Sequence, residues 1–356
     1  LGDVYKRQAP IVLVNHALTG NSNVAGEDGW WASLIGDGKC IDTTKYTVLA
    51  FNIPGNGYDG FVVDNYKDFV AGDIARIFLL GLESLNIDRI YAIIGGSLGG
   101  GIAWEMAAIN PGLAEHLIPV AADWKSTDWL IANCQIQEQF LVNSKQPVHD
   151  ARMHAMLCYR TPQSFKARFQ RSTNEELQVF NVESWLTHHG KKLNERFQLS
   201  AYKLANQLLK TIDITRDGET AFNNLQNSKT NIHIIGVDSD LFFTANENKD
   251  TFKQLAQAKS NVTYGEIQSL HGHDAFLIEF EQMQQLLKGV FDTNGKSQRI
   301  KILKFGGKSL SNGEGLERVL DIVSDKVKNG ENIAVVLSAR EKATDQLESI
   351  LDKAAK

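Results

Sequence analysis

Residues 90–108 read IYAIIGGSLGGGIAWEMAA, and this stretch decides the fold. Ile90–Ile94 is an apolar run typical of a buried strand, and Ile102–Ala108 is typical of a helix. Between them lies Gly95-Gly-Ser-Leu-Gly99, a G-x-S-x-G motif in strand–turn–helix order. Such a turn is tight and strains the backbone of its serine, so neighbours without side chains avoid clashes. The motif predicts that Ser97 is a nucleophile. The alternative is a serine in an ordinary glycine-rich turn.

The sequence on either side continues the alternation of strands and helices. Apolar runs at Ile11–Val14 and Tyr46–Phe51 predict two strands, and Phe69–Leu85 has helical spacing. Asn231–Gly236 and Asn261–Ile267 predict two more strands near the other end of this region. Strands that alternate with helices favour a parallel sheet with crossover connections, so we expect an α/β fold.

Residues 121–225 interrupt this alternation. They show helical periodicity and almost no strand signal, so we expect a helical lid inserted into the α/β domain. One apolar stripe at helical spacing predicts a helix side that faces the core; it consists of Leu193, Phe197, Ala201, Leu204 and Leu208.

Composition excludes several classes of function. The 356 residues include 37 Lys and Arg and 42 Asp and Glu, so the chain lacks the basic excess of most nucleic-acid-binding proteins. Its three cysteines form no C-x-x-C pair, which excludes a disulfide scaffold and a cysteine zinc site and favours the cytoplasm. No apolar run approaches the roughly 18 residues of a membrane span, and no ligand spacing predicts a metal site.

The length leaves room for two domains at roughly 150 residues each. Asp3–Gln8 resembles the translation of a transposon end used in sequencing libraries, so residues 1–8 are excluded as an artefact; the alternative is a genuine charged segment. Residues 9–292 then form the first domain, with its lid at about 121–225. The polar residues 293–299 predict a linker. A second, incomplete α/β unit begins at residue 300, so we expect a fragment of a longer protein.

A serine hydroxyl is a weak nucleophile until a base takes its proton, and that base needs an acid to orient it. In α/β-hydrolases the chain order is Ser, then Asp or Glu, then His. Asp240 and His273 each follow a predicted strand, where the catalytic groups of a parallel sheet gather. Asp238 and His271 are close competitors, and position alone does not separate the members of either pair.

Acyl transfer also needs N–H donors for the oxyanion. The fold supplies one from the residue after the nucleophile, here Leu98, and a second from the loop after an early strand. The loop Asn15–Gly20 fits the second position, and we predict the N–H of Leu18. Thr19 in this loop has a helix-capping role as its alternative.

Several segments, in the same order along the chain, resemble the homoserine O-acyltransferase family of α/β-hydrolase-fold enzymes. The resemblance runs from about residue 10 to 290. It favours Asp240 and His273 over their competitors. The matching segments are His16-Ala-Leu-Thr-Gly20, residues 28–42 (DGWWASLIGDGKCID), Gly95–Gly100, Ala151–Arg160 (ARMHAMLCYR), Ser239-Asp240 and Gly272–Leu277.

The resemblance implies a reaction. Ser97 would attack an acyl-CoA thioester, with acetyl-CoA as the expected donor, and form an acyl-enzyme. The hydroxyl of L-homoserine, deprotonated by His273, would then take the acyl group, a step of methionine biosynthesis. Acyl-CoA is a co-substrate and no cofactor is implied; a homodimer is one possible assembly. The loop Ile53–Gly60 is shorter than its family counterpart, which leaves the choice between an acetyl and a succinyl donor open.

The resemblance also implies a substrate site made of Thr19, Arg152, Tyr159 and Asp274. An arginine can bind a carboxylate with two hydrogen bonds, and Asp274 can pair with an ammonium group. The alternative for Arg152 is a surface salt bridge on a lid helix. A lid over the site would limit water, which competes with homoserine for the acyl-enzyme.

The C-terminal segment resembles a different family. Ile302-Leu-Lys-Phe-Gly-Gly-Lys-Ser309 is similar to the opening strand and loop of aspartate kinases, with Lys308 in place of the usual threonine. Val335–Ala339 is similar to that family's next strand. The resemblance implies a nucleotide-binding remnant at Lys304, Gly306, Gly307 and Ser309. Residues 300–356 cover only the start of such a domain, so we expect no kinase activity from them.

A fusion of two enzymes that act around homoserine synthesis is the resulting interpretation. One rival is a serine hydrolase of the same fold, because the triad alone does not choose between water and an amino-acid alcohol. Another is a non-catalytic module that docks to the kinase.

Overall fold

The computed structural model describes residues 9–291, 301–305, 313–328 and 333–337. The chain divides into two compact units, Leu1–Phe291 and Asp292–Lys356. The predicted artefact at residues 1–8 and the predicted linker at 293–299 lie outside the described residues.

The first unit is built on a six-stranded sheet in the order β10-β9-β6-β5-β1-β4, and each pair of neighbouring strands is parallel. The expected parallel α/β sheet is therefore confirmed. Its strands are β1 (Ile11–Asn15), β4 (Thr47–Leu49), β5 (Ile90–Gly96), β6 (Ala114–Val120), β9 (Asn231–Val237) and β10 (Val262–Ile267). The short strands β2 (Ile35–Gly36) and β3 (Ile41–Asp42) pair with each other.

β6 is a strand that the apolar pattern does not predict. It reads AEHLIPV, so Glu115, His116 and Pro119 interrupt its apolar run. It nevertheless lies beside β5 in the middle of the sheet, with Gly96 opposite Val120. Pairing on both sides stabilises a strand whose own sequence is a weak strand signal.

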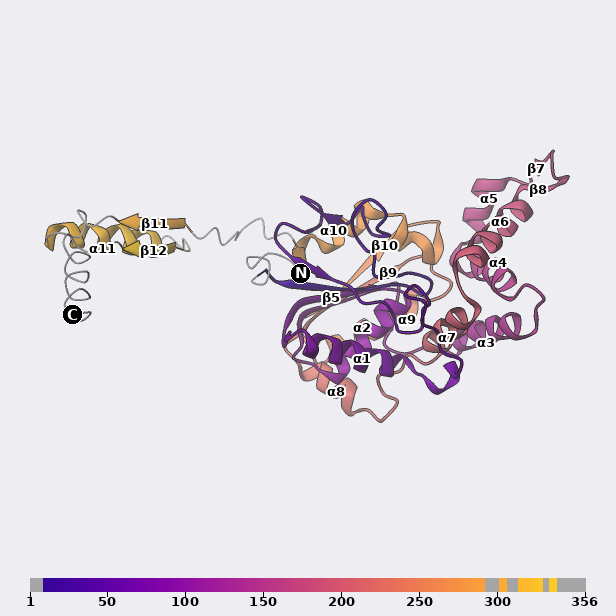
Figure 1. The fold of residues 1–356 in the computed structure, drawn as a ribbon, viewed down its shortest axis with the longest axis horizontal. Helices are drawn as coiled ribbons and strands as arrows, with labels where there is room; N and C mark the ends of the chain where they lie inside the picture. The colour runs from indigo at the N-terminus through magenta and orange to yellow at the C-terminus, as the bar shows by residue number, and fades with distance from the viewer. Residues whose placement is uncertain (1–8, 292–300, 306–312, 329–332, 338–356) are drawn as a thin grey trace, which may run out of the picture. The chain divides into compact units, whose positions relative to one another are not determined.

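Helices cover both faces of the sheet (Figure 1). One face carries α1 (Ala71–Ser84), α2 (Leu98–Ile109), α8 (Thr220–Asn227) and α9 (Ala245–Ala256), and the other carries α10 (Phe280–Phe291). Successive side chains of a strand enter opposite layers. Leu13 and Ile93 are buried on the α2 side, whereas Val12, Val14 and Ile94 are buried on the α10 side. Burial on both faces explains why these strands are continuous apolar runs.

The lid is a group of helices between β6 and β9. It lies beyond one end of the sheet (Figure 1). Its helices are α3 (Asp128–Asn143), α4 (Pro147–Tyr159), α5 (Pro162–Phe169), α6 (Asn181–Arg196) and α7 (Leu199–Lys210). A two-stranded hairpin, β7 (Thr173–Asn174) with β8 (Val179–Phe180), adds strand structure that the sequence did not predict.

Two details of the predicted lid are wrong. The range 121–225 includes most of α8, but that helix packs against α2 on one face of the sheet. The apolar stripe does not lie on one helix, because the extended residues Phe197 and Gln198 separate α6 from α7. All five stripe residues are still buried, so the prediction of a core-facing stripe is confirmed. No proline or glycine marks the break, so the local sequence gives no signal for it.

The start of α2 packs closely against the end of β1. A Cβ atom on Gly99 would lie 2.3 Å from the carbonyl oxygen of Asn15, and one on Gly95 would lie 2.3 Å from the carbonyl oxygen of Gly99. Backbone leaves no room for side chains at these positions. The glycines therefore bring β1, β5 and α2 together at the point where the chain turns at Ser97.

The loop after β1 is fixed from inside by His16, which is buried. Its Nε2 accepts the N–H of Ile53 at 3.0 Å, and its Nδ1 lies 2.8 Å from the carbonyl oxygen of Ala17. Burial lowers the pKa of His16 to about 4, so the ring is neutral at neutral pH. This neutral ring ties the Asn15–Gly20 loop to the loop that begins at Ile53.

The second unit contains a two-stranded sheet. Its strands β11 (Lys301–Phe305) and β12 (Ile333–Leu337) are parallel, and α11 (Gly313–Lys328) lies between them in the sequence. The strand predicted from residue 300 is thus present. Lys304 lies in β11, and the other predicted nucleotide-binding residues, Gly306, Gly307 and Ser309, lie outside the described residues.

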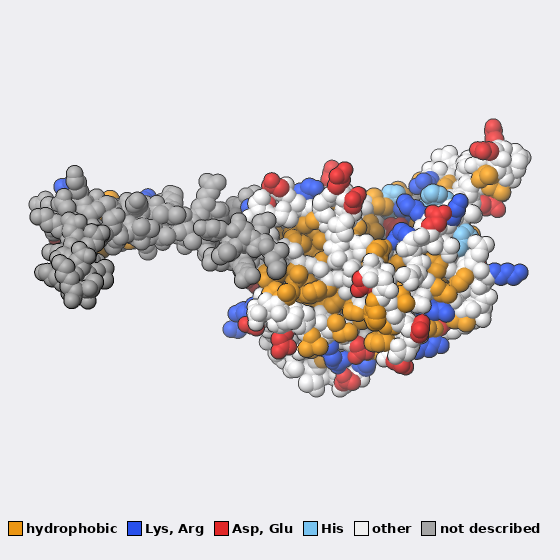
Figure 2. Space-filling view, in the orientation of Figure 1, with side chains coloured by type: hydrophobic (Ala, Val, Ile, Leu, Met, Phe, Trp, Pro, Cys, Tyr) orange, Lys and Arg blue, Asp and Glu red, His pale blue; other side chains and the backbone are white. Residues whose placement is uncertain are grey.

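Charged side chains of both signs are interspersed on the face of the first unit drawn in Figure 2. That face has no broad basic area, in keeping with the balanced composition. None of the helices in the described part of the chain is long and apolar enough to cross a membrane.

The close packing of α2 gives a first prediction. Gly99→Ala should lower the free energy of unfolding by at least about 2 kcal/mol, because the new methyl group meets backbone atoms that cannot move aside. The matched control is Gly289→Ala in the exposed part of α10, where no atom lies within 4 Å of the new Cβ. That change should raise stability by up to about 1 kcal/mol through helix propensity. Urea unfolding measures both; equal effects would contradict the packing argument.

A second prediction follows from His16. Its pKa of about 4 in the folded state lies below the ordinary histidine value of 6.5. As the pH falls from 6.5 towards 4, the unfolded chain binds a proton that the folded chain does not, so the free energy of unfolding decreases, by up to about 3 kcal/mol. His16→Gln keeps a side-chain acceptor for Ile53 but cannot titrate. Urea unfolding at pH 7.5, 5.5 and 4.5 should show that acid lowers the free energy of unfolding less in the variant than in the wild type. An equal decrease in both proteins would contradict this role of His16.

Candidate active site

Ser97 lies at a sharp turn between β5 and α2. Its φ of 56° and ψ of −126° fall in a region that non-glycine residues rarely adopt. Its own N–H donates to the carbonyl oxygen of Val120 on β6 at 2.9 Å, which holds the turn in place. A Cβ on the preceding Gly96 would lie 2.5 Å from the ring of Phe276. The strained backbone is thus supported on both sides, and the serine hydroxyl points out of the turn.

The structure brings Ser97, His273 and Asp240 into one hydrogen-bonded chain. His273 Nε2 lies 2.8 Å from Ser97 Oγ, and its Nδ1 lies 2.7 Å from Asp240 Oδ2. The second carboxylate oxygen of Asp240 accepts the N–H groups of Phe242 at 2.6 Å and Phe243 at 3.0 Å. The carboxylate therefore has a fixed orientation, and it fixes the imidazole with Nε2 towards the hydroxyl.

Aromatic rings surround the imidazole of His273, which lies in the short 3-10 helix η3 (Gly272–Leu277). Four ring centroids lie between 5.2 and 5.9 Å from that of the imidazole; they belong to Tyr159, Phe242, Phe243 and Phe276. The side chains of His273 and Asp240 are almost completely buried. The rings keep water away, so the hydrogen bonds of the triad act in a medium of low dielectric constant.

The competing residues have other partners. Asp238 Oδ1 accepts the N–H of Ser269 at 2.9 Å. His271 Nδ1 lies 3.2 Å from Nη1 of Arg160 and 3.4 Å from Oγ of Ser164. Neither side chain takes part in the hydrogen-bonded chain of Ser97, so the structure separates the two pairs that sequence position left open.

The predicted oxyanion donors belong to two different segments of the chain. Leu98 is the first residue of α2, and the N–H of a first helical residue has no acceptor within its own helix. Leu18 lines the same cavity as Ser97 and belongs to the loop that His16 holds. This placement is compatible with the predicted pair of donors.

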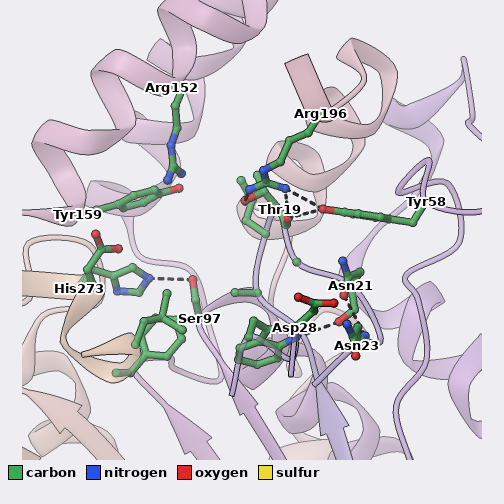
Figure 3. Close-up of a pocket in the computed structure, with 17 residues that line it drawn as sticks. Thr19, Asn21, Asn23, Asp28, Tyr58, Ser97, Arg152, Tyr159, Arg196 and His273 are labelled. Carbon is green, nitrogen blue, oxygen red and sulfur yellow. Dashed lines mark hydrogen bonds between the residues drawn. The ribbon is translucent and has the colours of Figure 1, made fainter. Parts of the chain in front are cut away.

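Ser97 lines a cavity of about 310 Å³ between the sheet and the lid. Figure 3 shows Arg152 and Tyr159 on one side and Arg196, Thr19 and Tyr58 on the other. Several residues of its wall were not predicted from the sequence. Asn23, Tyr58 and Arg196 belong to no quoted motif, and Trp30 lies in the quoted segment 28–42 without a predicted role.

Arg152 and Tyr159 both belong to α4. Seven residues separate them, about two helical turns, so they share one face of the helix. The guanidinium carbon of Arg152 lies 5.5 Å from the ring centroid of Tyr159. Burial raises the pKa of Tyr159 well above 10, while the charge of Arg152 lowers it and that of Asp274 raises it. A positive and a negative group thus flank one neutral phenol.

Asp274 follows His273 directly and lines the cavity. Its Oδ2 accepts a hydrogen bond from Nε of Arg160 at 2.8 Å, and both side chains are largely buried. The sequence predicted that Asp274 is available to an ammonium group, but one of its oxygens is already held by an arginine. Arg160 is the last residue of the quoted segment ARMHAMLCYR, and its ion pair crosses 114 residues of sequence, so no local pattern reveals it.

Thr19 lies at the mouth of the cavity. Its carbonyl oxygen accepts hydrogen bonds from Nη1 of Arg196 at 3.1 Å and from the hydroxyl of Tyr58 at 3.2 Å. Arg196 Nη1 also donates to the Tyr58 hydroxyl at 2.7 Å. No described helix begins beside Thr19, so the helix-capping alternative for it is wrong. These contacts join the end of α6 to the predicted oxyanion loop.

Within the described ranges, no group of three or more His, Cys, Asp or Glu side chains could hold a metal ion. The site consists of a hydrogen-bonded serine, histidine and aspartate beside a cavity with charged walls. Such an arrangement can form an acyl-enzyme and pass the acyl group to a second molecule.

The comparisons with known families agree with this geometry. Residues 10–278 match the family model for the alpha/beta hydrolase fold, and residues 299–356 match the amino acid kinase family. A solved esterase, E22, superimposes with a TM-score of 0.70 at 20% identity, covering 82% of this chain and 92% of that one. At this identity, the esterase shows the shared fold alone.

Relatives in sequence are more specific. The homoserine O-acetyltransferase of Chloroherpeton thalassium is 32% identical over 313 residues, covering 80% of this chain and 80% of that protein. The homoserine O-acetyltransferase of Cyclobacterium marinum is 32% identical over 318 residues, covering 83% and 88%. The solved homoserine O-acetyltransferase of Staphylococcus aureus has a TM-score of 0.68 at 25% identity and covers 82% and 86%. The chain therefore belongs to the homoserine O-acetyltransferase family within the alpha/beta hydrolase fold.

Proposed function

We propose that this chain transfers an acyl group from acyl-CoA, with acetyl-CoA as the preferred donor, to the hydroxyl of L-homoserine. The observation that carries the proposal is the joining of two features in one cavity. The hydrogen-bonded Ser97–His273–Asp240 chain opens beside the opposite charges of Arg152 and Asp274. The names of the relatives support the same acceptor and the same acyl group.

In the first half-reaction, Ser97 Oγ attacks the thioester carbonyl while His273 Nε2 takes the hydroxyl proton. The N–H groups of Leu18 and Leu98 receive the developing oxyanion. Collapse of the tetrahedral intermediate breaks the carbon–sulfur bond, and the CoA thiolate leaves with the proton from His273. Asp240 stabilises the imidazolium that forms between these steps. The product is an acyl ester on Ser97.

In the second half-reaction, the homoserine hydroxyl gives its proton to His273 Nε2 and attacks the acyl ester. The bond between the acyl group and Ser97 breaks, and Ser97 regains its proton from His273. Water can perform the same reaction, so the cavity has to favour the amino-acid alcohol. A bound acceptor held near the ester gains an effective concentration far above that of a free molecule.

The charges in the wall of the cavity suit an amino acid. The guanidinium of Arg152 can bind the α-carboxylate, and the free oxygen of Asp274 can bind the α-ammonium group. The two side chains line the same cavity, and the charges of both act on the phenol of Tyr159. A zwitterion bound there leaves its hydroxyl end free to reach the ester on Ser97.

The kinase-like segment extends the proposal beyond the first unit. Residues 299–356 match the amino acid kinase family, which supports a fusion between the acyltransferase and an aspartate kinase. We infer that the fused protein works in the cytoplasm on methionine biosynthesis, since aspartate kinase and homoserine acyltransferase act around the same intermediate. The intact hydrogen bonds of the triad argue against a purely docking role for the first unit.

A third prediction tests the reaction directly. CoA release from acetyl-CoA and from succinyl-CoA is followed with and without homoserine, for the wild type and Ser97→Ala. Release from acetyl-CoA should depend on homoserine and should fall by a factor on the order of 10⁴ or more in the variant, because the nucleophile is absent. Release that ignores homoserine would assign a hydrolase. No release from a folded protein would assign a docking module.

A fourth prediction concerns Arg152. In Arg152→Gln, the KM for homoserine should rise roughly ten- to a hundredfold, because a charge-assisted hydrogen bond to the carboxylate is lost. The KM for 3-aminopropan-1-ol, which is homoserine without its carboxylate, should change little. Arg152→Lys keeps the charge but cannot form two parallel hydrogen bonds to the carboxylate. Its KM for homoserine should therefore lie between those of the wild type and Arg152→Gln. A rise of equal size for both acceptors would show that Arg152 does not bind the carboxylate.

A further inference from the structure

Arg160 stands between the lid and the loop that carries the catalytic histidine. It follows α4 directly, one residue after Tyr159. Its Nε donates to Oδ2 of Asp274 at 2.8 Å, and its Nη1 lies 3.2 Å from Nδ1 of His271. The side chains of Arg160 and Asp274 are 18% and 16% exposed, so water screens their ion pair only in part.

The backbone around this ion pair is also fastened. The hydroxyl of Thr161, which begins the next helix, donates to the carbonyl oxygen of Leu270. Gly272 has a φ of +66°, and a Cβ there would lie 2.9 Å from the carbonyl oxygen of Tyr159. The junction of α4 and α5 therefore lies in direct contact with the loop, and Arg160 is in a position to set the conformation of Asp274.

The placement of Asp274 matters because a second arginine lines the same cavity. Arg152 and Asp274 line the same cavity and both alter the pKa of the same phenol. Among the described residues, Asp274 nevertheless forms its ion pair with Arg160 and none with Arg152. A carboxylate without this partner would be attracted to the nearest guanidinium group. An ion pair between Asp274 and Arg152 would occupy both charges that an amino acid needs.

We propose that Arg160 is a positioning residue that holds Asp274 apart from Arg152, and so keeps the cavity open to acceptors that carry both a carboxylate and an ammonium group. This inference rests on the proposed function. In this inference, Arg152 and Asp274 bind the two charges of the acceptor. Arg160 does not touch the substrate. Its role is to prevent the two binding charges from neutralising each other.

The test uses the full chain and two ligands. Homoserine carries both charges, whereas 4-hydroxybutanoate lacks the ammonium group and is measured as a competitor of homoserine. In Arg160→Gln, the KM for homoserine and the inhibition constant of 4-hydroxybutanoate should both rise, roughly ten- to a hundredfold, because freed Asp274 occupies Arg152. In Asp274→Asn, the KM for homoserine should rise while 4-hydroxybutanoate binds as in the wild type.

The double variant Arg160→Gln/Asp274→Asn distinguishes a positioning role of Arg160 from a general structural loss. Adding Asp274→Asn to Arg160→Gln removes the carboxylate that occupies Arg152, so the inhibition constant of 4-hydroxybutanoate should return to the value of Asp274→Asn alone. A merely structural loss would not be repaired by a second substitution. Failure of this recovery, or a KM for homoserine unchanged in Arg160→Gln, would overturn the inference.

Control variants make these outcomes distinct. Arg168→Gln removes another lid arginine, which lies over the rings of Phe169 and Trp185 and makes no ion pair with Asp274. It should leave both ligand constants unchanged, and a loss equal to that of Arg160→Gln would count against the inference. Arg160→Lys retains a charge near Asp274 and should recover part of the homoserine affinity. CoA release by the wild type that does not depend on homoserine would contradict both the proposed function and this inference. Homoserine-dependent release by the wild type, with an unchanged KM for homoserine in Arg160→Gln, would contradict the inference alone.

Discussion

The strained turn at Ser97 is the constraint on which the rest of the structure depends. A non-glycine residue with a φ of 56° is unfavourable by itself, so its surroundings must hold it. Gly95 and Gly99 let the backbones of β5, β1 and α2 approach to distances that any side chain would prevent. This approach places Ser97 at the carboxyl ends of the strands, where the loops that carry Asp240 and His273 begin. The packing that holds β1, β5 and α2 together therefore also positions Ser97.

The sequence predicts the parts of the site that local chemistry determines. A strand, a G-x-S-x-G turn and a helix occur in order, so Ser97 could be identified from a few residues. The choice of Asp240 over Asp238 could not, because both lie in one loop and differ only in backbone geometry. Phe242 and Phe243 direct their N–H groups at Asp240, whereas Asp238 accepts the N–H of Ser269. The family resemblance favoured Asp240, which the spacing of the residues alone did not.

The remaining features depend on contacts between distant parts of the chain. Arg160 and Asp274 are far apart in sequence, and Arg196 meets Thr19 across 177 residues. No periodicity or motif carries such information. The break between α6 and α7 also has no local signal. The buried stripe continues through it, and only the extended backbone at Phe197 ends the first helix. Tertiary packing, which local propensity does not encode, decides these points.

In the proposed reaction, the selectivity for an amino-acid alcohol over water depends on the lid and its contacts. The sheet, the turn and the triad geometry suit any serine acyltransferase or hydrolase, and a solved esterase shares the fold with a TM-score of 0.70. The lid places Arg152 and Tyr159, the proposed binding groups, in the wall of the cavity, and it contacts the loops after β1 and β10. Arg160 reaches the loop of His273, and Arg196 reaches the loop of Leu18. A lid held at both loops keeps the proposed binding charges at a fixed distance from Ser97. In the proposed reaction, homoserine depends on that distance to bring its hydroxyl to the acyl ester, whereas water does not.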